Sequence, residues 1–122
     1  MTGVQTCALP IYVTGAYARA LEAVKLSQTH SERGNEAEAL RILGEIGLRM
    51  PDFDRDATAA TLEAALSLAT ACEMRPLMMQ CHDAFARLHQ RVRDEASAEA
   101  HRSKAAALAG EMGVVTDARA VA

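Results

Sequence analysis

The sequence has no tryptophan, and its 122 residues include only two tyrosines, two phenylalanines and three prolines. With so few aromatic rings, a core has to be built from alanine, leucine, isoleucine and methionine, which suits closely packed helices. No apolar run approaches the roughly 18 residues of a membrane span, and the N-terminus lacks the basic and apolar regions of a secretory signal. The composition therefore predicts a single soluble, cytoplasmic domain with no membrane partner.

A strong positive charge is also missing, since the net charge is −3. Nucleic-acid binding depends on clustered lysine and arginine side chains that release counterions from the phosphates. The densest basic cluster, Arg87, Arg91 and Arg93, is followed at once by Asp94 and Glu95. We interpret this cluster as a solvated helix end and predict no nucleic-acid partner.

Few residues could carry chemistry. The three cysteines match neither a disulfide framework nor a zinc motif in their spacing; they are Cys7, Cys72 and Cys81. His82 and His89 share a helix face, and His101 on the next helix could approach them, but zinc needs three or four converging ligands. We therefore favour packing histidines and buried or idle thiols over a metal site. Without a catalytic Ser-His-Asp order, a glycine-rich phosphate loop or a carboxylate pair, the sequence predicts no enzyme activity of its own and no cofactor.

Apolar residues recur at three- and four-residue steps along most of the chain, which predicts five helices. Their expected ranges are 12–33, 35–50, 56–73, 75–92 and 94–113. The inner faces are predicted, helix by helix, to be Val13, Tyr17, Ala20, Leu21 and Val24; Ala39, Ile42, Leu43, Ile46 and Met50; Thr58, Leu62, Ala65, Leu66 and Ala69; Leu77, Cys81, Phe85, Leu88 and Val92; Ala98, Ala105, Leu108 and Met112.

Capping chemistry predicts where these helices begin and end. Gly34 is expected in the left-handed conformation that stops the first helix, and Asn35 with Glu38 is expected to form the N-cap and capping box of the second. The other expected signals are Asp56 and Asp94 as N-caps, Pro76 near the start of the fourth helix, and Gly113 as the final stop.

The two ends of the chain differ from the rest. Residues 1–11 carry no charge and no helical stripe, and they resemble the conceptual translation of a sequencing-library adapter. We therefore expect them to be a non-native segment, with a genuine short leader as the alternative, and we expect the natural protein to extend further upstream. Residues 114–122 have weak periodicity and are expected to fray.

Two signatures recur along the chain. The odd-numbered helices share triplets spaced by four and then three residues: Val13, Tyr17, Ala20; Thr58, Leu62, Ala65; and Ala98, Arg102, Ala105. The even-numbered helices share a three-one-three spacing in Leu40, Leu43, Gly44, Gly47 and in His82, Phe85, Ala86, His89. Positions 13, 58 and 98 are thus equivalent in the first set, and positions 40 and 82 in the second. The chain therefore contains an internal repeat of two helices.

These signatures resemble the B and A helices of the tetratricopeptide repeat. Leu43 and Gly44 match the Leu-Gly pair of the A helix, and Ala98 and Ala105 match the alanines of the B helix. The departures are His82, His89 and Gly47 at aromatic positions, Ala86 at the glycine position and Arg102 at an apolar one. The resemblance implies an all-α, right-handed helical solenoid of about two and a half tetratricopeptide-like hairpins across residues 12–113.

The long period of the two-helix repeat, and the residues of segments such as 39–46, 74–77 and 111–113, indicate a narrower group of repeat proteins. They are similar to the C-terminal repeats of bacterial signalling ATPases that often carry an adenylate or guanylate cyclase domain, and of related transcriptional regulators. This implies a non-catalytic interaction module that forms the C-terminal regulatory tail of a larger protein. The alternatives are a free-standing repeat adaptor or the tail of a transcriptional regulator.

In such solenoids the solvent-facing stripe of the A helices lines the binding groove. Here the stripe consists of Glu38, Arg41, Glu45, Arg49, Gln80, Asp83, Arg87, Gln90 and Arg91. Its mixed charge fits a polar protein or peptide segment, or another domain of the same polypeptide, although a solvated face would look the same. Because solenoids need about three repeats and polar end caps, the isolated chain is also expected to be marginally stable or to associate with itself.

Overall fold

The computed structural model describes the backbone of residues 2–113 and the side chains of residues 15–113. Residues 2–113 form five α-helices and no strand, which confirms the predicted all-α class. The helices are α1 (Thr2–Thr29), α2 (Arg33–Gly47), α3 (Arg55–Ala71), α4 (Arg75–Arg91) and α5 (Glu95–Met112). In this part of the chain, no helix has the length and apolar character needed to cross a membrane. The tail predicted to fray, residues 114–122, lies outside the described residues.

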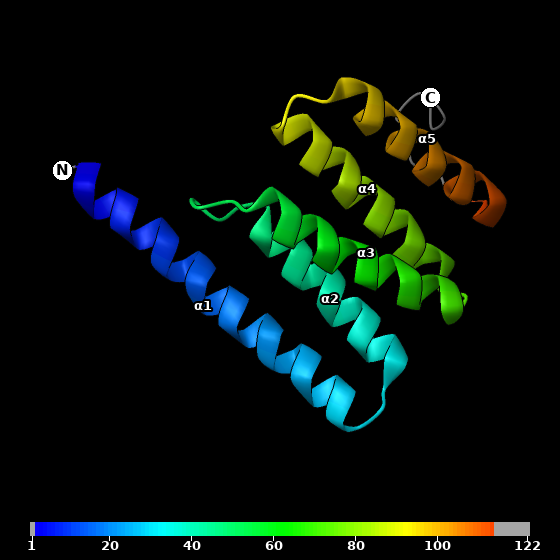
Figure 1. The fold of residues 1–122 in the computed structure, drawn as a ribbon, viewed down its shortest axis with the longest axis horizontal. Helices are drawn as coiled ribbons and strands as arrows, with labels where there is room; N and C mark the ends of the chain where they lie inside the picture. Colours follow the sequence, from blue (N-terminus) through cyan, green and yellow to red (C-terminus); the bar gives the residue numbers. More distant parts are fainter. Residues whose placement is uncertain (1, 114–122) are drawn as a thin grey trace.

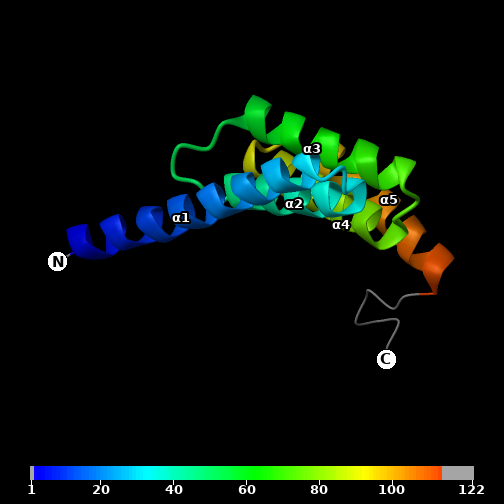
Figure 2. The ribbon, with the colours of Figure 1, turned by 90° about the horizontal axis from the view of Figure 1, so that it is seen from below.

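The helices follow one another in space in the same order as in the chain, and consecutive helices run antiparallel (Figure 1). Each helix packs against the next one, and α2 also touches α4. Figure 2 shows why this second contact is possible, because α3 is raised to one side of α2 and α4. Helices α2 and α4 therefore have three neighbours each: α1, α3 and α4 around α2, and α2, α3 and α5 around α4.

Three of the connections between helices share one geometry. The turns that follow α1, α3 and α4 each contain a residue with positive φ, namely Ser31 (56°), Glu73 (55°) and Arg93 (63°). In each turn a backbone N–H bonds to the carbonyl five residues earlier, which closes the helix end. These bonds run from Glu32 to Ser27 (2.9 Å), from Met74 to Ala69 (2.8 Å) and from Asp94 to His89 (2.8 Å). Within the described chain, the remaining connection is the longer loop of residues 48–54 between α2 and α3, which does not have this turn geometry.

The turns also define which residues of successive hairpins are equivalent. Ser31, Glu73 and Gly113 follow α1, α3 and α5 with positive φ, so positions 31, 73 and 113 correspond. In this register position 13 pairs with position 55, whereas the apolar triplets pair it with position 58, three residues later. Because three residues make nearly one helical turn, the apolar stripe looks similar in both registers. The position of the turn distinguishes the two registers.

The predicted boundary between the first two helices is wrong. Helix α2 begins at Arg33, so Gly34 and Asn35 lie inside its first turn instead of stopping α1 and capping α2. The left-handed residue is Ser31, and Glu32 occupies the N-cap position without a side-chain capping bond. Glycine is the residue that adopts positive φ most easily, but the backbone bonds at the end of α1 place that conformation at a serine.

The start of α3 also differs from the prediction. Asp54, rather than Asp56, is the N-cap, and its carboxylate accepts a hydrogen bond of 3.1 Å from the backbone N–H of Ala57. Two aspartates so close together have the same capping chemistry, so only the backbone geometry separates them. The other predicted signals are confirmed: Asp94 accepts from the N–H of Ser97, Pro76 lies in the first turn of α4, and Gly113 has φ of 72°.

Helix α1 begins at Thr2, well before the expected start at Tyr12. The segment resembling a translated adapter, residues 1–11, is thus helical from residue 2 in the structure and continuous with the rest of α1. The sequence of this segment carries no apolar stripe that would indicate a helix. Extending an existing helix by one residue costs far less free energy than nucleating a new helix. A helix can therefore continue through a segment without such a stripe.

The core between α2, α3 and α4 consists mainly of alanine and leucine side chains, together with Cys81 and Phe85. The buried residues of two neighbouring clusters are Ala37, Ala65, Ala69, Leu77 and Cys81, and Leu48, Leu62, Ala84, Phe85 and Leu88. This confirms most of the inner faces predicted for α3 and α4. Two predicted inward residues are wrong, because Leu21 is 38% exposed and Ile42 is 40% exposed. A third, Val13, lies outside the described side chains. Periodicity identifies an apolar face, but it does not show whether another element covers that face.

Two glycines let α2 and α3 approach each other closely. A Cβ atom on Gly44 would lie 2.5 Å from Cδ2 of Leu62, and one on Gly47 would lie 3.0 Å from Oγ1 of Thr58. Leu62 fills the space beside Gly44 and has no exposed surface. Any larger residue at position 44 would therefore displace a core leucine.

Candidate functional site

The α2 part of the predicted partner-binding stripe is occupied by ion pairs within the chain. Arg41 donates to Glu38 at 2.5 Å and also to Glu45, and Arg87 of α4 donates to Glu45 at 3.1 Å. Burial alone would lower the pKa of Arg41, but its hydrogen bonds to Glu38 and Glu45 outweigh burial and raise that pKa. These side chains link α2 to α4, so they have a structural role whether or not a partner binds.

Arg91 also bonds within the chain. Its guanidinium donates to the backbone carbonyls of Leu48 and Met50 and lies 4.3 Å from the centre of the Phe53 ring. The carbonyl of Leu48 lies at the C-terminal end of α2, where helices leave acceptors without partners. Arg91 therefore fastens the loop between α2 and α3 onto α4.

The rest of the stripe remains open to solvent. Arg49, Gln80, Asp83 and Gln90 keep part or all of their surface in solvent, and the side chain of Arg87 is 49% exposed. The structure brings Asp83, Arg87 and Gln90 together with Ala86 and Arg102 around a hollow of about 450 Å³. This hollow lies between α4 and α5 and is lined mainly by polar side chains. Arg49 and Gln80 do not line it.

Arg102 is a residue of this surface that the sequence-based prediction missed. It was interpreted as a departure from an apolar packing position. Instead, its guanidinium bonds to Glu95 and Glu99, both at 3.2 Å, and lines the hollow beside Asp83 and Arg87. Glu99 and Glu95 precede Arg102 by three and seven residues on the same helix face. This spacing of opposite charges on one helix face is the sequence signal that identifies Arg102 as part of the polar surface.

The histidines predicted to approach one another do so between α4 and α5. The His101 ring stacks on the rings of Phe85, His82 and His89, with centroid distances of 4.9, 5.3 and 5.4 Å. Nδ1 of His82 and Nδ1 of His101 are 3.0 Å apart, so one ring donates and the other accepts. Burial, followed by the proximity of His82, His89 and Lys104, lowers the pKa of His101 to about 4. At neutral pH the His82–His101 pair is therefore an uncharged packing element.

The donor sets in the described residues do not fit a metal ion. No group of three or more histidine, cysteine, aspartate or glutamate side chains within this part of the chain is arranged to hold one. Cys81 is completely buried among apolar residues, and burial raises the pKa of its thiol to about 11. This thiol is protonated at neutral pH, which makes it a poor ligand and a poor nucleophile.

We expect Cys81 to be nearly inert towards thiol reagents in the folded chain. In a variant carrying Cys7→Ser and Cys72→Ser, the remaining thiol should react at least about 100-fold more slowly than in urea. Burial both shields the thiol from the reagent and raises its pKa to about 11, which lowers the thiolate fraction. A colour assay with an aromatic disulfide at pH 8, with and without urea, measures both rates. Equal rates in the two conditions would show that Cys81 is accessible.

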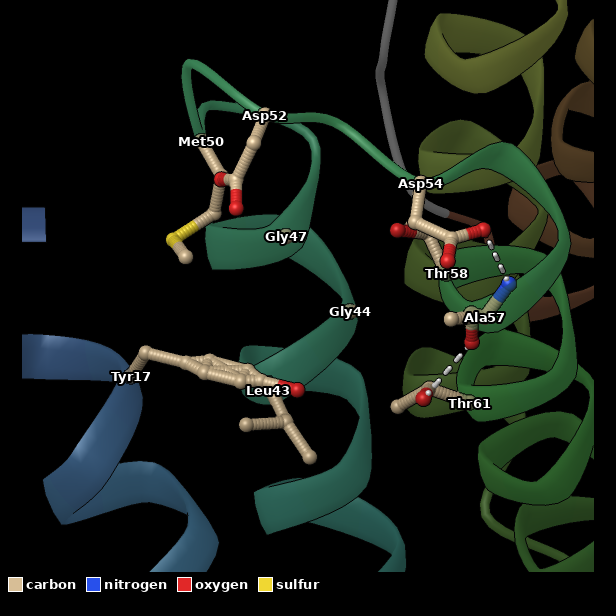
Figure 3. A pocket seen from close by; sticks show the side chains of 10 residues that line it. All are labelled: Tyr17, Leu43, Gly44, Gly47, Met50, Asp52, Asp54, Ala57, Thr58 and Thr61. Atoms are coloured by element: carbon tan, nitrogen blue, oxygen red, sulfur yellow. Dashed lines mark hydrogen bonds between the residues drawn. The ribbon is translucent and has the colours of Figure 1, made fainter. Parts of the chain in front are cut away.

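A second hollow was not anticipated from the sequence. It has a volume of about 280 Å³ and lies between α1, the C-terminal end of α2, the following loop and the start of α3. Figure 3 shows the Tyr17 ring lying across α2 beside Leu43, with Met50 and Asp52 on the loop. Gly44 and Gly47 contribute backbone to its lining, and the sides on which their Cβ atoms would lie are occupied by Leu62 and Thr58.

The polar groups of this second hollow are partly committed to holding α3. Asp54 caps the helix through the N–H of Ala57, and the Thr61 hydroxyl donates to the carbonyl of Ala57 at 3.0 Å (Figure 3). Its lining includes no histidine, cysteine or lysine, and of its two aspartates Asp54 already accepts the N–H of Ala57. The arrangement of its polar groups fits helix capping better than catalysis.

Comparison of this chain with protein-family models, with curated proteins and with solved structures gives no match. Its function is therefore inferred from the geometry of the chain itself. Of the two hollows, the one on α4 and α5 is lined by side chains that the sequence had indicated for partner binding, Asp83, Arg87 and Gln90.

Proposed function

We propose that this chain is a tetratricopeptide-like, right-handed helical repeat module that binds a polar segment of another protein or domain and catalyses no reaction. The observation that carries the proposal is the open polar hollow formed by Asp83, Arg87, Gln90 and Arg102. Arg87 and Arg102 are already held by carboxylates, which orients their remaining N–H groups without fixing them on a partner. Such an oriented, solvent-exposed surface suits a peptide that carries both charges and amides.

Three features support the repeat part of the proposal. Left-handed residues follow α1, α3 and α5, at Ser31, Glu73 and Gly113, and a further one, Arg93, follows α4. Gly44 allows the close contact with Leu62 that the Leu-Gly signature requires. The alanines assigned to the B helices are also buried, namely Ala20, Ala65, Ala98 and Ala105. Each hairpin contacts only its neighbours in the chain, as in quasi-one-dimensional repeat proteins.

Selection from a display library of random short peptides tests the binding function. We expect peptides to be enriched on the immobilised chain and to bind it in fluorescence anisotropy. Asp83→Lys should weaken this binding at least about fivefold, because it reverses the charge at the hollow. Glu22→Lys is the matched control, since it makes the same charge change at an exposed position of α1 outside the hollow. No enrichment, or equal weakening by both variants, would contradict the proposal.

We further propose that the module is the C-terminal regulatory tail of a larger bacterial nucleotide-dependent signalling protein. The support is the similarity of residues 39–46, 74–77 and 111–113 to the repeats of such proteins. The coding DNA upstream of Tyr12 tests this directly. A cyclase or P-loop ATPase domain in frame would agree with it, whereas a start codon after only further repeats would favour a free-standing adaptor, and a DNA-binding domain a transcriptional regulator.

A further inference from the structure

The hollow between α1, α2 and α3, which we call the Tyr17 hollow, is formed by four consecutive parts of the chain. These parts are α1, the C-terminal half of α2, the loop of residues 48–54 and the first turns of α3. Its volume of about 280 Å³ lies just below the range of about 300–1,000 Å³ that is typical of pockets for drug-sized ligands. The hollow therefore has the size for one small ligand.

The hairpins α2–α3 and α4–α5 can be matched residue by residue. Asp54 and Asp94 are the N-caps of α3 and α5, and each carboxylate accepts the N–H of the third residue that follows it. Ser31 and Glu73 hold the same place in the turns before α2 and α4. The matched positions that line the Tyr17 hollow in the first hairpin include Leu43 with Phe85, Gly47 with His89, and Thr61 with His101.

In the second hairpin these matched positions pack aromatic rings against one another. The centre of the His101 ring lies 4.9 Å from that of Phe85 and 5.4 Å from that of His89. The first hairpin has glycine and threonine at the positions of the two histidines, namely Gly47 and Thr61, so neither ring has a counterpart there. The Tyr17 hollow is therefore lined by the counterparts of residues that bury rings in the other hairpin.

Thr58 is a buried polar residue that borders this hollow. It is only 6% exposed. The hydroxyls of Thr61 and Thr70 donate to the carbonyl four residues earlier, whereas the Thr58 hydroxyl forms no hydrogen bond within the described part of the chain. Its Oγ1 faces Gly47, since a Cβ atom on that glycine would lie 3.0 Å away. A buried hydroxyl without a partner costs free energy, so Thr58 offers a ligand a hydrogen bond that the chain does not use.

The charged groups of the hollow have one sign. Asp52 and Asp54 line it, and none of the described residues that line it is basic. Oδ1 of Asp54 caps α3, which leaves its second oxygen as an acceptor. Figure 3 shows the Asp52 side chain extending from the loop towards α2, beside Met50. Arg91 donates to the carbonyls of Leu48 and Met50 and does not line the hollow. The two carboxylates therefore favour a positively charged ligand.

We propose that the Tyr17 hollow binds a small organic cation, a ring-sized apolar group that carries a primary ammonium. The Tyr17 ring, Leu43 and Met50 supply apolar surface for the ring of the ligand, and an aromatic face also attracts a cation. The Thr58 hydroxyl and the carboxylates of Asp52 and Asp54 supply acceptors for the three N–H groups of the ammonium.

Amide NMR titration of the whole chain with phenethylammonium, 2-phenylethanol and phenylacetate tests the proposal. The three probes carry the same ring on a two-carbon chain and differ in charge. Phenethylammonium should shift the amide signals of Gly44 and Gly47 with a dissociation constant of about 1 mM. The neutral alcohol should bind at least about threefold more weakly, and the anion should not bind, because the carboxylates repel it.

Three variants assign the binding to individual groups. Asp52→Asn should weaken the binding of phenethylammonium about threefold. Asp56→Asn is the matched control and should leave binding unchanged, because Asp56 is an exposed aspartate outside the hollow. Thr58→Val should weaken binding about fivefold without lowering the melting temperature, since its hydroxyl has no bond within the described chain to lose. Thr61→His introduces the residue of the matched position and should abolish binding by filling the hollow.

Several outcomes would overturn the proposal. Signals of Gly44 and Gly47 that stay unchanged up to about 10 mM phenethylammonium would do so, as would equal affinity for the cation and the anion. Equal weakening by Asp52→Asn and Asp56→Asn would show that the Asp52 carboxylate does not select the charge. A lower melting temperature of Thr58→Val would assign its hydroxyl to the fold instead of the ligand. The Tyr17 hollow shares no lining residue with the hollow of α4 and α5, so each binding function can fail without the other.

Discussion

Gly44→Ala is expected to destabilise the chain by about 1–2 kcal/mol. The new methyl group would lie 2.5 Å from Cδ2 and 2.8 Å from Cγ of Leu62, which is completely buried and cannot move aside freely. Overpacking of this kind costs about 1–3 kcal/mol, while replacing a helical glycine by alanine returns up to about 1 kcal/mol. Thermal unfolding followed by circular dichroism should show a melting temperature lower by roughly 5–10 °C.

Gly110→Ala is the matched control for this prediction. Position 110 lies in α5, and an added Cβ there would meet no atom within 4 Å. The same substitution should therefore stabilise the chain by about 0.5–1 kcal/mol through helix propensity alone. An increase in stability at position 44, or equal changes at positions 44 and 110, would show that the contact between α2 and α3 is not as close as described.

A double-mutant cycle identifies the contact partner. Leu62→Ala alone should cost about 2–5 kcal/mol, because it leaves a cavity in the core. In that background Gly44→Ala should become neutral or stabilising, since the leucine atoms that it meets are gone. Additive effects of the two substitutions would show that Leu62 is not the residue displaced.

The free energy of unfolding is expected to fall as the pH is lowered from about 6.5 to about 4. In the unfolded chain histidine gains its proton near pH 6.5, but burial beside His82, His89 and Lys104 holds the pKa of His101 at about 4 in the fold. Between these values the unfolded state binds more protons, so acid favours unfolding, and this contribution is exhausted below about pH 4. Allowing for solvent screening, the loss should be about 1–2 kcal/mol.

Neighbouring groups act in the same direction. Burial, followed by Lys104, also lowers the pKa of His82, against the opposing pull of Asp83 and Glu63. The 3.0 Å contact between the Nδ1 atoms of His82 and His101 tolerates one added proton but not two, because two N–H groups would then face each other. The stack on α4 and α5 should therefore loosen in acid before the α2–α3 core does.

Urea unfolding of the unmodified chain and of His101→Phe at pH values between about 4 and 7.5 measures this effect. Phenylalanine preserves the stacking on Phe85 and removes the titrating group, so the variant should lose most of the pH dependence while staying folded at neutral pH. His30→Gln, at an exposed position after α1, is the control and should keep the full dependence. Parallel curves for all three proteins would contradict the assignment to His101.

The contacts of Arg91 show that a residue of a predicted solvent-facing stripe can instead bond within the chain. Spacing alone places Arg91 beside Gln90 on a solvent-facing surface. In the fold Arg91 instead holds the carbonyls of Leu48 and Met50, which lie two helices earlier in the chain. A long arginine side chain can reach a distant helix end that no local pattern reveals. The same applies to Arg87 and Glu45, which pair between α4 and α2.

The sequence by itself determined the all-α class, most of the helix faces in α3 and α4, and the cap at Asp94, because these features follow from local periodicity and local hydrogen bonding. It also indicated Asp83, Arg87 and Gln90 as a polar surface. Only the tertiary structure decided that Ser31 rather than Gly34 ends α1, and that Ser31 and Glu73 hold the same place in the turns after α1 and α3.

The tertiary structure also decided which apolar faces are covered. Ile42 and Ala84 occupy equivalent positions of α2 and α4, yet one is 40% exposed and the other is fully buried. The apolar periodicity is the same in α2 and α4, because it reflects only the regular turn of an α-helix. Whether a face becomes core or interface depends on the neighbour that packs against it, and that information is not local to the helix.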